Sequence, residues 1–477
     1  MRAIPLALTY DDVLIVPKRS TLISRSEAST RTRLTKKINL NIPIISANMD
    51  TVSESEMAIA LARLGGISII HRFMTIEENV EEIKRVKRAQ NFIINDPYTI
   101  EPIKTIGEAK KFIARYGVSG LLVANNDKKL KGVLSSRDML FARDDSQLIE
   151  YVMTPREKLV VGSRATTFRE AKEKMGLNKI EKLPLVDEND VIIGLITSAD
   201  IRNLVDYPLA NIDSSGRLIV GGSVGVHGDY IERAQELLKA GADVLVIDIA
   251  HGHSEMMFNA INHLRTACPN AQLIAGNIAT AEAARELCEA GVDAIKVGVG
   301  PGTTCITRLV TGCGVPQLTA VLNAAEVAKN YNVPVIADGG IQKSGDIVKA
   351  LGAGADSVML GGLLAGTKES PGIVMTRGDK KYKVCRGSAS FAVAQRRKTV
   401  QQETKNLSDV VAEGTESVVP YKGQVTDLIG QLIGGLKSGM SYTNSHTITE
   451  LQNNVDFVQI TPAGVRESGP HDLLDVK

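Results

Sequence analysis

The chain has 477 residues, of which 43% are hydrophobic and 23% are charged, and its formal net charge is +2. This length predicts more than one domain, and the near-neutral charge excludes the basic surface of proteins that bind nucleic acid or anionic membranes. The five cysteines form neither a CxxC pair nor a zinc-ligand cluster. The first residues lack a signal-peptide pattern, and no apolar run reaches the roughly 18 residues of a membrane span. We therefore expect a cytoplasmic protein with no membrane or nucleic-acid partner.

Residues 1–94 begin with a loop-rich arm and continue as short apolar runs that alternate with amphipathic stretches. The runs 42–47 and 67–70 have the composition of buried strands, and 54–64 and 76–88 have the periodicity of helices. This βα alternation predicts the first part of an α/β domain.

The pattern changes between residues 95 and 208, where the chain contains an internal repeat. The segment GVLSSRDML recurs 62 residues later as GLITSADIR, and each copy follows an apolar strand. In each copy a hydroxyl and a carboxylate stand three residues apart where the strand becomes a helix: Ser135 with Asp138, and Thr197 with Asp200. The pattern resembles the signature of tandem CBS domains, which in that family can hold adenine or guanine nucleotides. A helix N-terminal cap is the alternative interpretation.

From residue 209 the βα alternation returns and continues to about residue 366. Together with the two early strands, the later apolar runs make eight, which predicts a closed (β/α)8 TIM barrel with its active site at the carboxyl ends of the strands. An open doubly wound sheet is the alternative, but no GxGxxG opens a helix after the first strand. We thus expect 1–94 and 209–477 to form one barrel that the repeat at 95–208 interrupts. The later strands are expected at 218–224, 244–250, 273–278, 294–300, 334–340 and 357–364.

Glycine pairs and polar residues follow the predicted strands. Pairs at 339–340 and 361–362 come after the seventh and eighth strands, the usual place of a phosphate site in this fold. Asp338 precedes the first pair and is placed to accept hydrogen bonds from ribose hydroxyls. His251 and His253 have no third ligand nearby in the sequence, which favours a hydrogen-bonding role over a metal site.

A lone cysteine lies in the glycine-rich stretch 297–314, directly after an apolar strand. Thr303 precedes Cys305 closely, and Thr307 and Arg308 follow it. A thiol in a turn beside hydroxyl and guanidinium groups indicates covalent catalysis on an anionic substrate. A buried structural cysteine is the alternative interpretation.

The segment 386–423, here called the flap, is long, polar and only weakly periodic. Long loops of this kind are usually functional or disordered, and this one predicts a lid over the barrel mouth. Glu413, near its end, is a candidate to place a carboxylate in the site.

Seven motifs together resemble the IMP dehydrogenase and GMP reductase family. GVGPGTTCITR is similar to the catalytic-cysteine loop of that family, and the other six motifs follow its order. The resemblance covers almost the whole chain and includes a CBS pair inserted after the second βα unit. It implies a homotetramer, with an octamer as the larger assembly, that acts on GMP or IMP. The six other motifs are VIDIAHGHS, IAGNIAT, VIADGGI, MLGGLLAGT, EGTESVVPYKG and VRESGPHD.

The resemblance also assigns roles to residues of this chain. It implies that Cys305 attacks C2 of the purine, with Thr307 and Glu413 as its catalytic partners. Asp248 and Asn277 would face the nicotinamide cofactor. The positions that it implies for the substrate are Asn48, Met49, Thr303, Asp338, Gly340, Gly361, Gly362, Gly387, Ser388 and Gly414.

Two further ligands follow from the resemblance. Regulatory purine nucleotides would bind the CBS pair at Ser135, Asp138, Thr197 and Asp200. A potassium ion would be held by Gly300, Gly302 and Cys305, with Glu467 and Ser468 nearby.

The two branches of the family differ in the reaction. The dehydrogenase oxidises IMP to XMP with NAD and activates water with an Arg-Tyr pair in the flap, whereas the reductase converts GMP to IMP and ammonia with NADPH. This flap has Arg396, Arg397 and Lys398 but no Arg-Tyr pair between 386 and 413, and Asn48-Met49-Asp50 matches the reductase. We therefore expect a GMP reductase, with an IMP dehydrogenase as the alternative and a non-catalytic nucleotide-sensing scaffold as a third possibility. The CBS insert and the VRESGPHD tail are more familiar from dehydrogenases.

Overall fold

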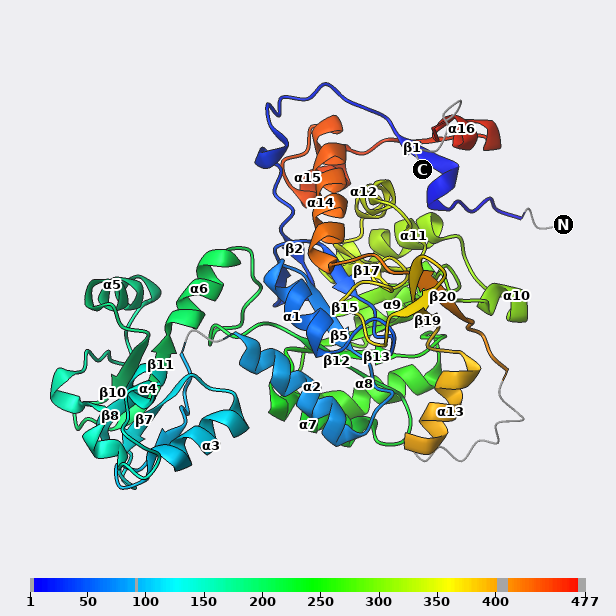
Figure 1. The fold of residues 1–477 in the computed structure, drawn as a ribbon. Coiled ribbons are helices and arrows are strands. Elements are labelled where there is room, and N and C mark those ends of the chain that lie inside the picture. The colour runs from blue at the N-terminus through cyan, green and yellow to red at the C-terminus, as the bar shows by residue number, and fades with distance from the viewer. Residues whose placement is uncertain (1–3, 91–92, 401–410, 471–477) are drawn as a thin grey trace. The chain divides into compact units, whose positions relative to one another are not determined.

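The computed structural model describes residues 4–90, 93–400 and 411–470. By its contacts the chain divides into two compact units, which are described separately (Figure 1). The first comprises the residues up to 89, 209–213 and those from 218 onward, and the second comprises 90–208 with 214–217. The second unit begins a few residues before the expected insert, because Ile94 forms a β-bridge with Leu195 of that unit.

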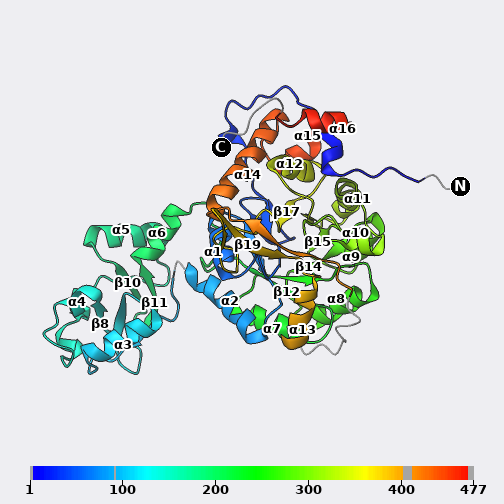
Figure 2. The same ribbon diagram turned by 45° about the vertical axis from the view of Figure 1, so that its right-hand side comes forward.

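The first unit is built on a closed parallel barrel, which confirms the predicted (β/α)8 fold and excludes the open sheet. The strands pair in the order β12-β13-β14-β15-β16-β17-β4-β5 (Figure 2). The two early strands close the ring, because β4 pairs with β17 and β5 pairs with β12. The strands are β4 (Ile44–Ser46), β5 (Ile67–Ile70), β12 (Gly221–Val224), β13 (Val244–Asp248), β14 (Leu273–Ile278), β15 (Ala294–Val297), β16 (Val335–Asp338) and β17 (Ser357–Leu360).

Helices surround the barrel, and most of them follow a strand directly. The last is α14 (Val425–Tyr442), which follows the flap and contacts both α12 and α1, so it takes the eighth position of the ring. The others are α1 (Ser55–Arg63), α2 (Ile76–Ala89), α7 (Tyr230–Ala240), α8 (Glu255–Ala267), α9 (Ala281–Glu289), α11 (Gln317–Asn330) and α12 (Ser344–Gly352).

Alternation along the strands separates two cores. Ile45, Val246 and Ile336 belong to the apolar core inside the barrel, whereas their sequence neighbours pack outward against the helices. Leu34, directly after β2 (Thr32–Arg33), and Leu40, in β3 (Asn39–Leu40), belong to the same inner core. Two residues beyond this apolar layer, the same faces of β13, β15 and β16 carry Asp248, Lys296 and Asp338, so the barrel interior becomes charged at the carboxyl ends of these strands.

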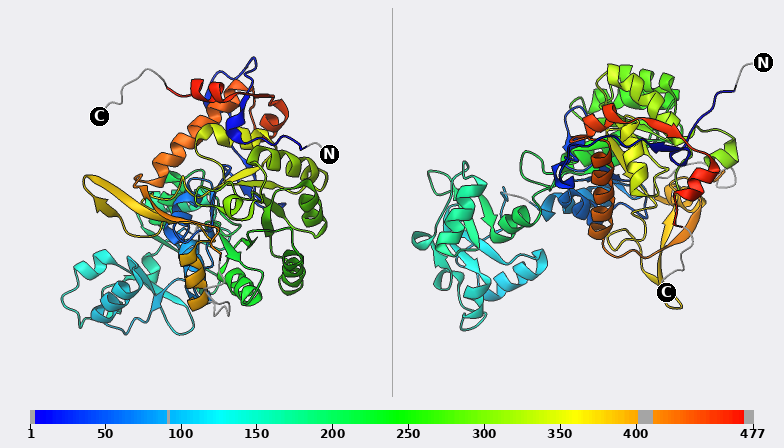
Figure 3. Two further views of the ribbon diagram at one scale, coloured as in Figure 1. Left: turned by 90° about the vertical axis from the view of Figure 1, so that its right-hand side faces the viewer. Right: turned by 90° about the horizontal axis from the view of Figure 1, so that it is seen from above.

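The flap and the chain termini add small elements to the barrel unit. β1 (Val13–Ile15) pairs with β21 (Phe457–Gln459), which joins the two ends of the chain. The hairpin of β18 (Met375–Arg377) and β19 (Lys380–Arg386), yellow in Figure 3, projects from the barrel and pairs with β20 (Glu416–Pro420). The remaining elements are η1 (Tyr10–Asp12), η2 (Arg25–Glu27), α10 (Thr307–Thr311), α13 (Phe391–Val400), α15 (Ile448–Asn454) and α16 (Pro462–Glu467).

The chain leaves and re-enters the barrel unit beside the end of α1. Arg63 donates a hydrogen bond to the Ala89 carbonyl at 3.1 Å, and Asn211 N–H donates to the Ala62 carbonyl at 2.9 Å. Asn211 Nδ2 also donates to the Gly66 carbonyl. The barrel itself therefore fixes these two crossing points, and residues 214–217 then belong to the second unit again.

The second unit has an internal repeat that follows the one in the sequence. Each copy has a helix that begins with a capping box, Thr105 with Glu108 and Thr167 with Glu170, and then a β-hairpin and a second helix. No helix among the described residues is long and apolar enough to cross a membrane. The elements are β6 (Thr99–Ile100), α3 (Ile106–Tyr116), β7 (Gly120–Ala124), β8 (Leu130–Ser135), α4 (Ser136–Leu140), η3 (Ile149–Tyr151), β9 (Thr154–Pro155), η4 (Arg156–Lys158), α5 (Phe168–Asn178), β10 (Lys182–Val186), β11 (Ile192–Thr197) and α6 (Ser198–Asp206).

Candidate active site

A cavity of 330 Å³ lies at the carboxyl ends of the barrel strands. Its walls come from the loops that follow β4, β5, β13, β14, β15 and β16, and from both ends of the flap. Most of the residues that the sequence singles out meet here. The predicted residues in its lining are Asn48, Met49, Asp248, Asn277, Gly300, Gly302, Cys305, Thr307, Asp338, Gly387, Ser388, Glu413 and Gly414.

The cysteine loop after β15 depends on a glycine at its start. Gly298 has φ +150°, and a Cβ there would lie 2.0 Å from the Asp338 carbonyl oxygen, so no larger residue fits. The loop then turns tightly, with Cys305 N–H donating to the Gly302 carbonyl at 3.0 Å. Cys305 is half-buried, and its thiol is free. The loop thus presents a thiol at the cavity wall.

The thiol begins a short row of polar contacts that ends in the flap. Cys305 Sγ lies 3.1 Å from Thr307 Oγ1, and Thr307 Oγ1 donates to Glu413 Oε2 at 2.8 Å. Because a hydroxyl has one hydrogen, a Thr307 that donates to the carboxylate accepts from the thiol. The backbone fixes this register, since Ile306 N–H donates to the Glu413 carbonyl at 2.8 Å. The row is a path for a proton from sulfur to carboxylate.

A buried lysine lies at the centre of the polar layer below the cavity. Lys296 is inward-facing on β15, two residues beyond the apolar Ala294, and it is 2% exposed. Its Nζ donates to Asp248 Oδ1 at 3.0 Å, to Asp338 Oδ2 at 2.8 Å and to Asn277 Oδ1. Asn277 Nδ2 in turn donates to Asp338 Oδ2 at 2.9 Å. The residues expected at the cofactor and at the ribose therefore belong to one network.

The charges of this network support one another. Burial alone would lower the pKa of Lys296, but Asp248 and Asp338 outweigh it and raise that pKa. Burial likewise acts to raise the pKa of Asp248, and the Lys296 ammonium, with Arg72 and the Asn48 amide, brings it below its ordinary value. The lysine and Asp248 are thus charged at neutral pH.

The residues expected at the phosphate lie beside the cysteine loop, outside the cavity lining. A Cβ on Gly362 would lie 2.6 Å from Thr303 Oγ1, so the exit of β17 and this threonine are in direct contact. A Cβ on Gly340 would lie 3.5 Å from Pro301. Lys422 Nζ donates to the carbonyls of Gly362 and Leu363 at 2.7 and 2.8 Å. The structure therefore gathers Thr303 and the two glycine pairs around one loop.

Two other side chains near the site have clear roles. Arg308 follows the thiol in the sequence, and its guanidinium donates to the carbonyls of Val299 and Val315, so it supports the loop. His253 lies 3.1 Å from Glu286 Oε2, the hydrogen-bonding role that its sequence context favours.

Comparison with known proteins identifies the family. The family described as IMP dehydrogenase / GMP reductase domain matches residues 7–471. The chain belongs to this family. An IMP dehydrogenase of Nitrosopumilus maritimus is 50% identical over 98% of each chain, and a GMP reductase of Leishmania donovani is 48% identical over 98% of each. The crystal structure of a GMP reductase from Trypanosoma brucei in complex with guanosine 5'-monophosphate is 46% identical, with a TM-score of 0.92 over 99% of both chains.

Membership of the IMP dehydrogenase and GMP reductase family makes the chain an NAD(P)-dependent oxidoreductase of purine metabolism. Relatives from both branches match it at similar identity and over nearly their whole length. The family therefore defines the class of chemistry and leaves the choice of reaction to the residues of the site.

The five residues expected at a potassium ion do not all lie together. Gly300, Gly302 and Cys305 share the cysteine loop, and all three line the cavity. Glu467 and Ser468 are exposed at the end of α16, which contacts η1, and they are not in that lining. The single chain thus brings three of the five together.

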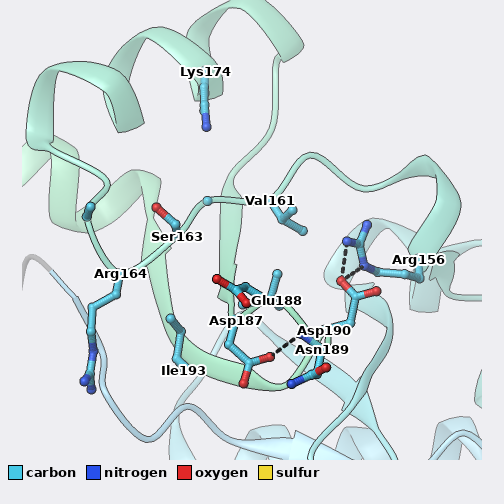
Figure 4. A pocket seen from close by; sticks show the side chains of 13 residues that line it. Arg156, Val161, Ser163, Arg164, Lys174, Asp187, Glu188, Asn189, Asp190 and Ile193 are labelled. Atoms are coloured by element: carbon cyan, nitrogen blue, oxygen red, sulfur yellow. Dashed lines mark hydrogen bonds and ion pairs between the residues drawn. The ribbon is translucent and has the colours of Figure 1, made fainter.

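The residues expected at a nucleotide in the repeat are bonded to each other. Ser135 Oγ donates to Asp138 Oδ2 at 2.6 Å, and Thr197 Oγ1 donates to Asp200 Oδ2 at 2.5 Å, so both pairs form the helix caps that the alternative interpretation describes. A separate cavity of 930 Å³ in the second unit contains none of these four residues (Figure 4). Arg164, Lys174 and the hairpin turn 187–190 line it.

Some residues of the cavity lining were missed from the sequence. Lys296 lies inside an apolar run of the sequence, and only its inward-facing position on the barrel strand distinguishes it. Arg72 and Phe73 follow β5, so the rule that barrel sites lie at the carboxyl ends of strands could have found them. Met359 also lines the cavity.

Proposed function

We propose that this member of the family is an NADPH-dependent GMP reductase, which converts GMP to IMP and ammonia. The observation that carries this choice is that two arginines of the flap are paired with a buried carboxylate. Arg386 Nη1 lies 3.4 Å from Asp50 Oδ2, and Arg396 Nη1 lies 3.8 Å from the same oxygen. These two arginines are paired with a buried carboxylate, and the flap has no Arg-Tyr pair to activate water. A flap that does not activate water protects a covalent intermediate from hydrolysis.

A second support is Asn48, whose Nδ2 donates to Asp248 Oδ2 at 3.0 Å. The family resemblance implies proline or alanine here in the dehydrogenase branch, and neither side chain can donate this bond. The neighbour from Trypanosoma brucei, at 46% identity, is itself a GMP reductase in complex with GMP.

The catalytic steps use the row of contacts at Cys305. The thiol proton passes through Thr307 to Glu413, and the thiolate attacks C2 of the bound purine. Glu413 then returns the proton through Thr307 to the amino group on C2, so that the C2–N bond breaks and ammonia leaves. The product of this half is a thioimidate linked to Cys305. A positioned acid of this kind contributes typically about 10²–10⁴-fold to the rate.

The second half needs a hydride at C2. Reduced nicotinamide, when bound, would supply it. Cys305 then leaves C2 as a thiolate, and IMP is released. Asp248 and Asn277 fit this cofactor, because both line the cavity with Cys305 and their oxygens can accept from a carboxamide. A solvent proton restores the thiol.

The remaining residues bind the nucleotide. We assign the phosphate to Thr303, Gly340, Gly361 and Gly362, and the ribose to Asp338. The purine would lie against Met49, Gly387, Ser388 and Gly414, all in the cavity lining. The carbonyls of Gly300, Gly302 and Cys305 are the part of a potassium site that this chain supplies.

IMP dehydrogenase is the alternative, and the 50% identity to the Nitrosopumilus maritimus enzyme favours it. One spectrophotometric assay separates the two: absorbance of the reduced nicotinamide is followed with GMP plus NADPH, and separately with IMP plus NAD. We expect consumption of NADPH in the first and no change in the second. Formation of NADH from IMP alone would overturn the proposal.

We further propose that the second unit, residues 95–208, is a tandem CBS module that binds purine nucleotides and alters activity or the assembly of tetramers into octamers. The four capping residues would then exchange their mutual bonds for bonds to ribose and phosphate. Deletion of 95–208 should abolish the response of turnover to ATP, GTP or GMP and spare turnover itself. An unchanged response in the deletion variant would refute the assignment.

A further inference from the structure

Lys296 has used all its hydrogen-bonding capacity within the protein. An ammonium has three N–H donors, and those of Lys296 go to Asp248, Asp338 and Asn277. With no donor left and 2% exposure, the lysine has nothing to offer a ligand directly. Its effect on any ligand must pass through these three partners.

The lysine fixes both aspartates, and Asp338 keeps one carboxylate oxygen for a ligand. Asp338 Oδ2 accepts from both Lys296 and Asn277, and among the described residues Asp338 Oδ1 has no donor. Asp248 Oδ1 accepts from Lys296, while its Oδ2 accepts from Asn48. The orientation of both carboxylates is thus set by a single ammonium, and a rotation of one changes the bond available to the other.

The charges of the network also make both aspartates depend on Lys296. With the ammonium, the two aspartates and Lys296 carry a net charge of about −1, and Arg72 beside Asp248 is the other cation that acts on this network. Without the ammonium, two carboxylates would remain close together in a buried layer with no shared cation. Breaking a buried ion pair in this way is costly, because it leaves an uncompensated charge.

We infer that Lys296 is a positioning residue that couples the nucleotide subsite at Asp338 to the cofactor subsite at Asp248, so that each ligand alters the affinity of the other. The inference rests on the proposed function for which ligand meets which aspartate. Coupling of this kind is reciprocal and typically amounts to about 5–150-fold in affinity.

Calorimetry can measure the coupling without turnover. The dissociation constant of GMP is determined with and without saturating NADP⁺, a pair that cannot exchange a hydride. We expect a ratio of about 5 or more in the wild type. In Lys296→Met the ratio should fall to within about twofold of one, and both ligands should bind at least about tenfold more weakly.

Lys87→Met is the matched control. Lys87 is also a buried lysine between two aspartates, with Nζ at 3.1 Å from Asp213 and 2.7 Å from Asp243, but it lies on α2 and outside the cavity lining. It should lower the melting temperature and leave the binding ratio at the wild-type value. If circular dichroism shows that Lys296→Met is unfolded, Lys296→Gln, which keeps two N–H donors, replaces it.

The outcomes are distinct. A wild-type ratio retained in a folded Lys296 variant overturns the coupling, and so does a ratio lost equally in Lys87→Met. If the wild type turns over IMP and NAD instead of GMP and NADPH, the proposed reaction fails, while the same measurement with IMP and NADH, which cannot exchange a hydride, still tests the lysine.

Discussion

The chain contains hydroxyl–carboxylate pairs in two regions, and they do different things. In the second unit, Thr197 and Asp200 are three residues apart and close on each other: the hydroxyl donates to the carboxylate at 2.5 Å and accepts the Asp200 N–H at 3.3 Å. In the barrel, Thr307 and Glu413 are 106 residues apart, and the hydroxyl contacts Cys305 on its other side. The first pair is complete in itself, whereas the second continues to a reactive group.

This difference separates a structural element from a catalytic one. A pair formed within one turn satisfies the free N–H groups of a helix start and needs nothing from the rest of the fold. A pair formed between the flap and the cysteine loop exists only when the barrel is folded and the flap is in place. The same two functional groups therefore stabilise a helix in one region and move a proton in the other.

Among changes to the Cys305–Thr307–Glu413 contacts in the barrel, removal of the thiol should have the largest effect on turnover. Cys305→Ala should lower kcat by at least about 10⁴-fold, because no covalent adduct can form. Nucleotide binding measured by calorimetry should persist, since the side chain removed is small. Cys313→Ala, which removes an exposed thiol from the same glycine-rich stretch, should leave kcat unchanged. Turnover in Cys305→Ala would show that the mechanism is not covalent.

Removal of the proton acceptor should have the next largest effect. Glu413→Gln should lower kcat by about 10²–10³-fold with little change in KM, because general acid–base catalysis is lost. Thr307→Val should cost a similar factor, and the double variant should lose little more, since the two residues act in one row. Glu416→Gln, three residues along in the same segment, is the control and should retain kcat within about threefold. Additive losses in the double variant would contradict a shared path.

Removal of the cap hydroxyl should have the smallest effect and none on turnover. Thr197→Ala should destabilise the start of α6 by about 1 kcal/mol at neutral pH. Hydrogen exchange of the amides of 198–202 in the full chain measures this, with Ser136→Ala, whose hydroxyl does not cap α4, as the control. A loss of kcat comparable with that of Glu413→Gln would remove the distinction between the two regions.

The stability contributed by the Thr197–Asp200 cap should also depend on pH in a defined direction. Burial raises the pKa of Asp200 above its ordinary value, although both bonds from Thr197 lower it. A raised folded-state pKa means that the stability contributed by this group is present when the carboxyl is protonated and is lost as the pH rises through the folded-state pKa. Because Thr197→Ala removes a bond to the ionised form, its cost should be larger at pH 7 than at pH 4. An equal cost at both pH values would show that the hydroxyl does not interact with the carboxylate.

Local patterns in the sequence predicted the fold well, because most barrel strands are apolar runs whose side chains are buried on both faces. The cysteine loop was also recognisable, since the glycines and the thiol are contiguous. The contact between Thr307 and Glu413 could not be derived from spacing, as it depends on how the flap folds back. Lys296 was missed because an inward position two residues beyond Ala294 is defined only once the barrel register is known.

The attachment of the second unit has a consequence for the evolution of the barrel. Arg63 and Ala62 hold the points where the chain exits and re-enters, at Ala89 and Asn211, so the barrel does not depend on the intervening residues to bring these points together. The entropy cost of a loop between two fixed ends grows only with the logarithm of its length, about 0.6 kcal/mol for each doubling. Replacing a short connection by a whole domain therefore costs the barrel only a few kcal/mol. The position can gain, lose or exchange a module while the chemistry at the opposite ends of the strands stays unchanged.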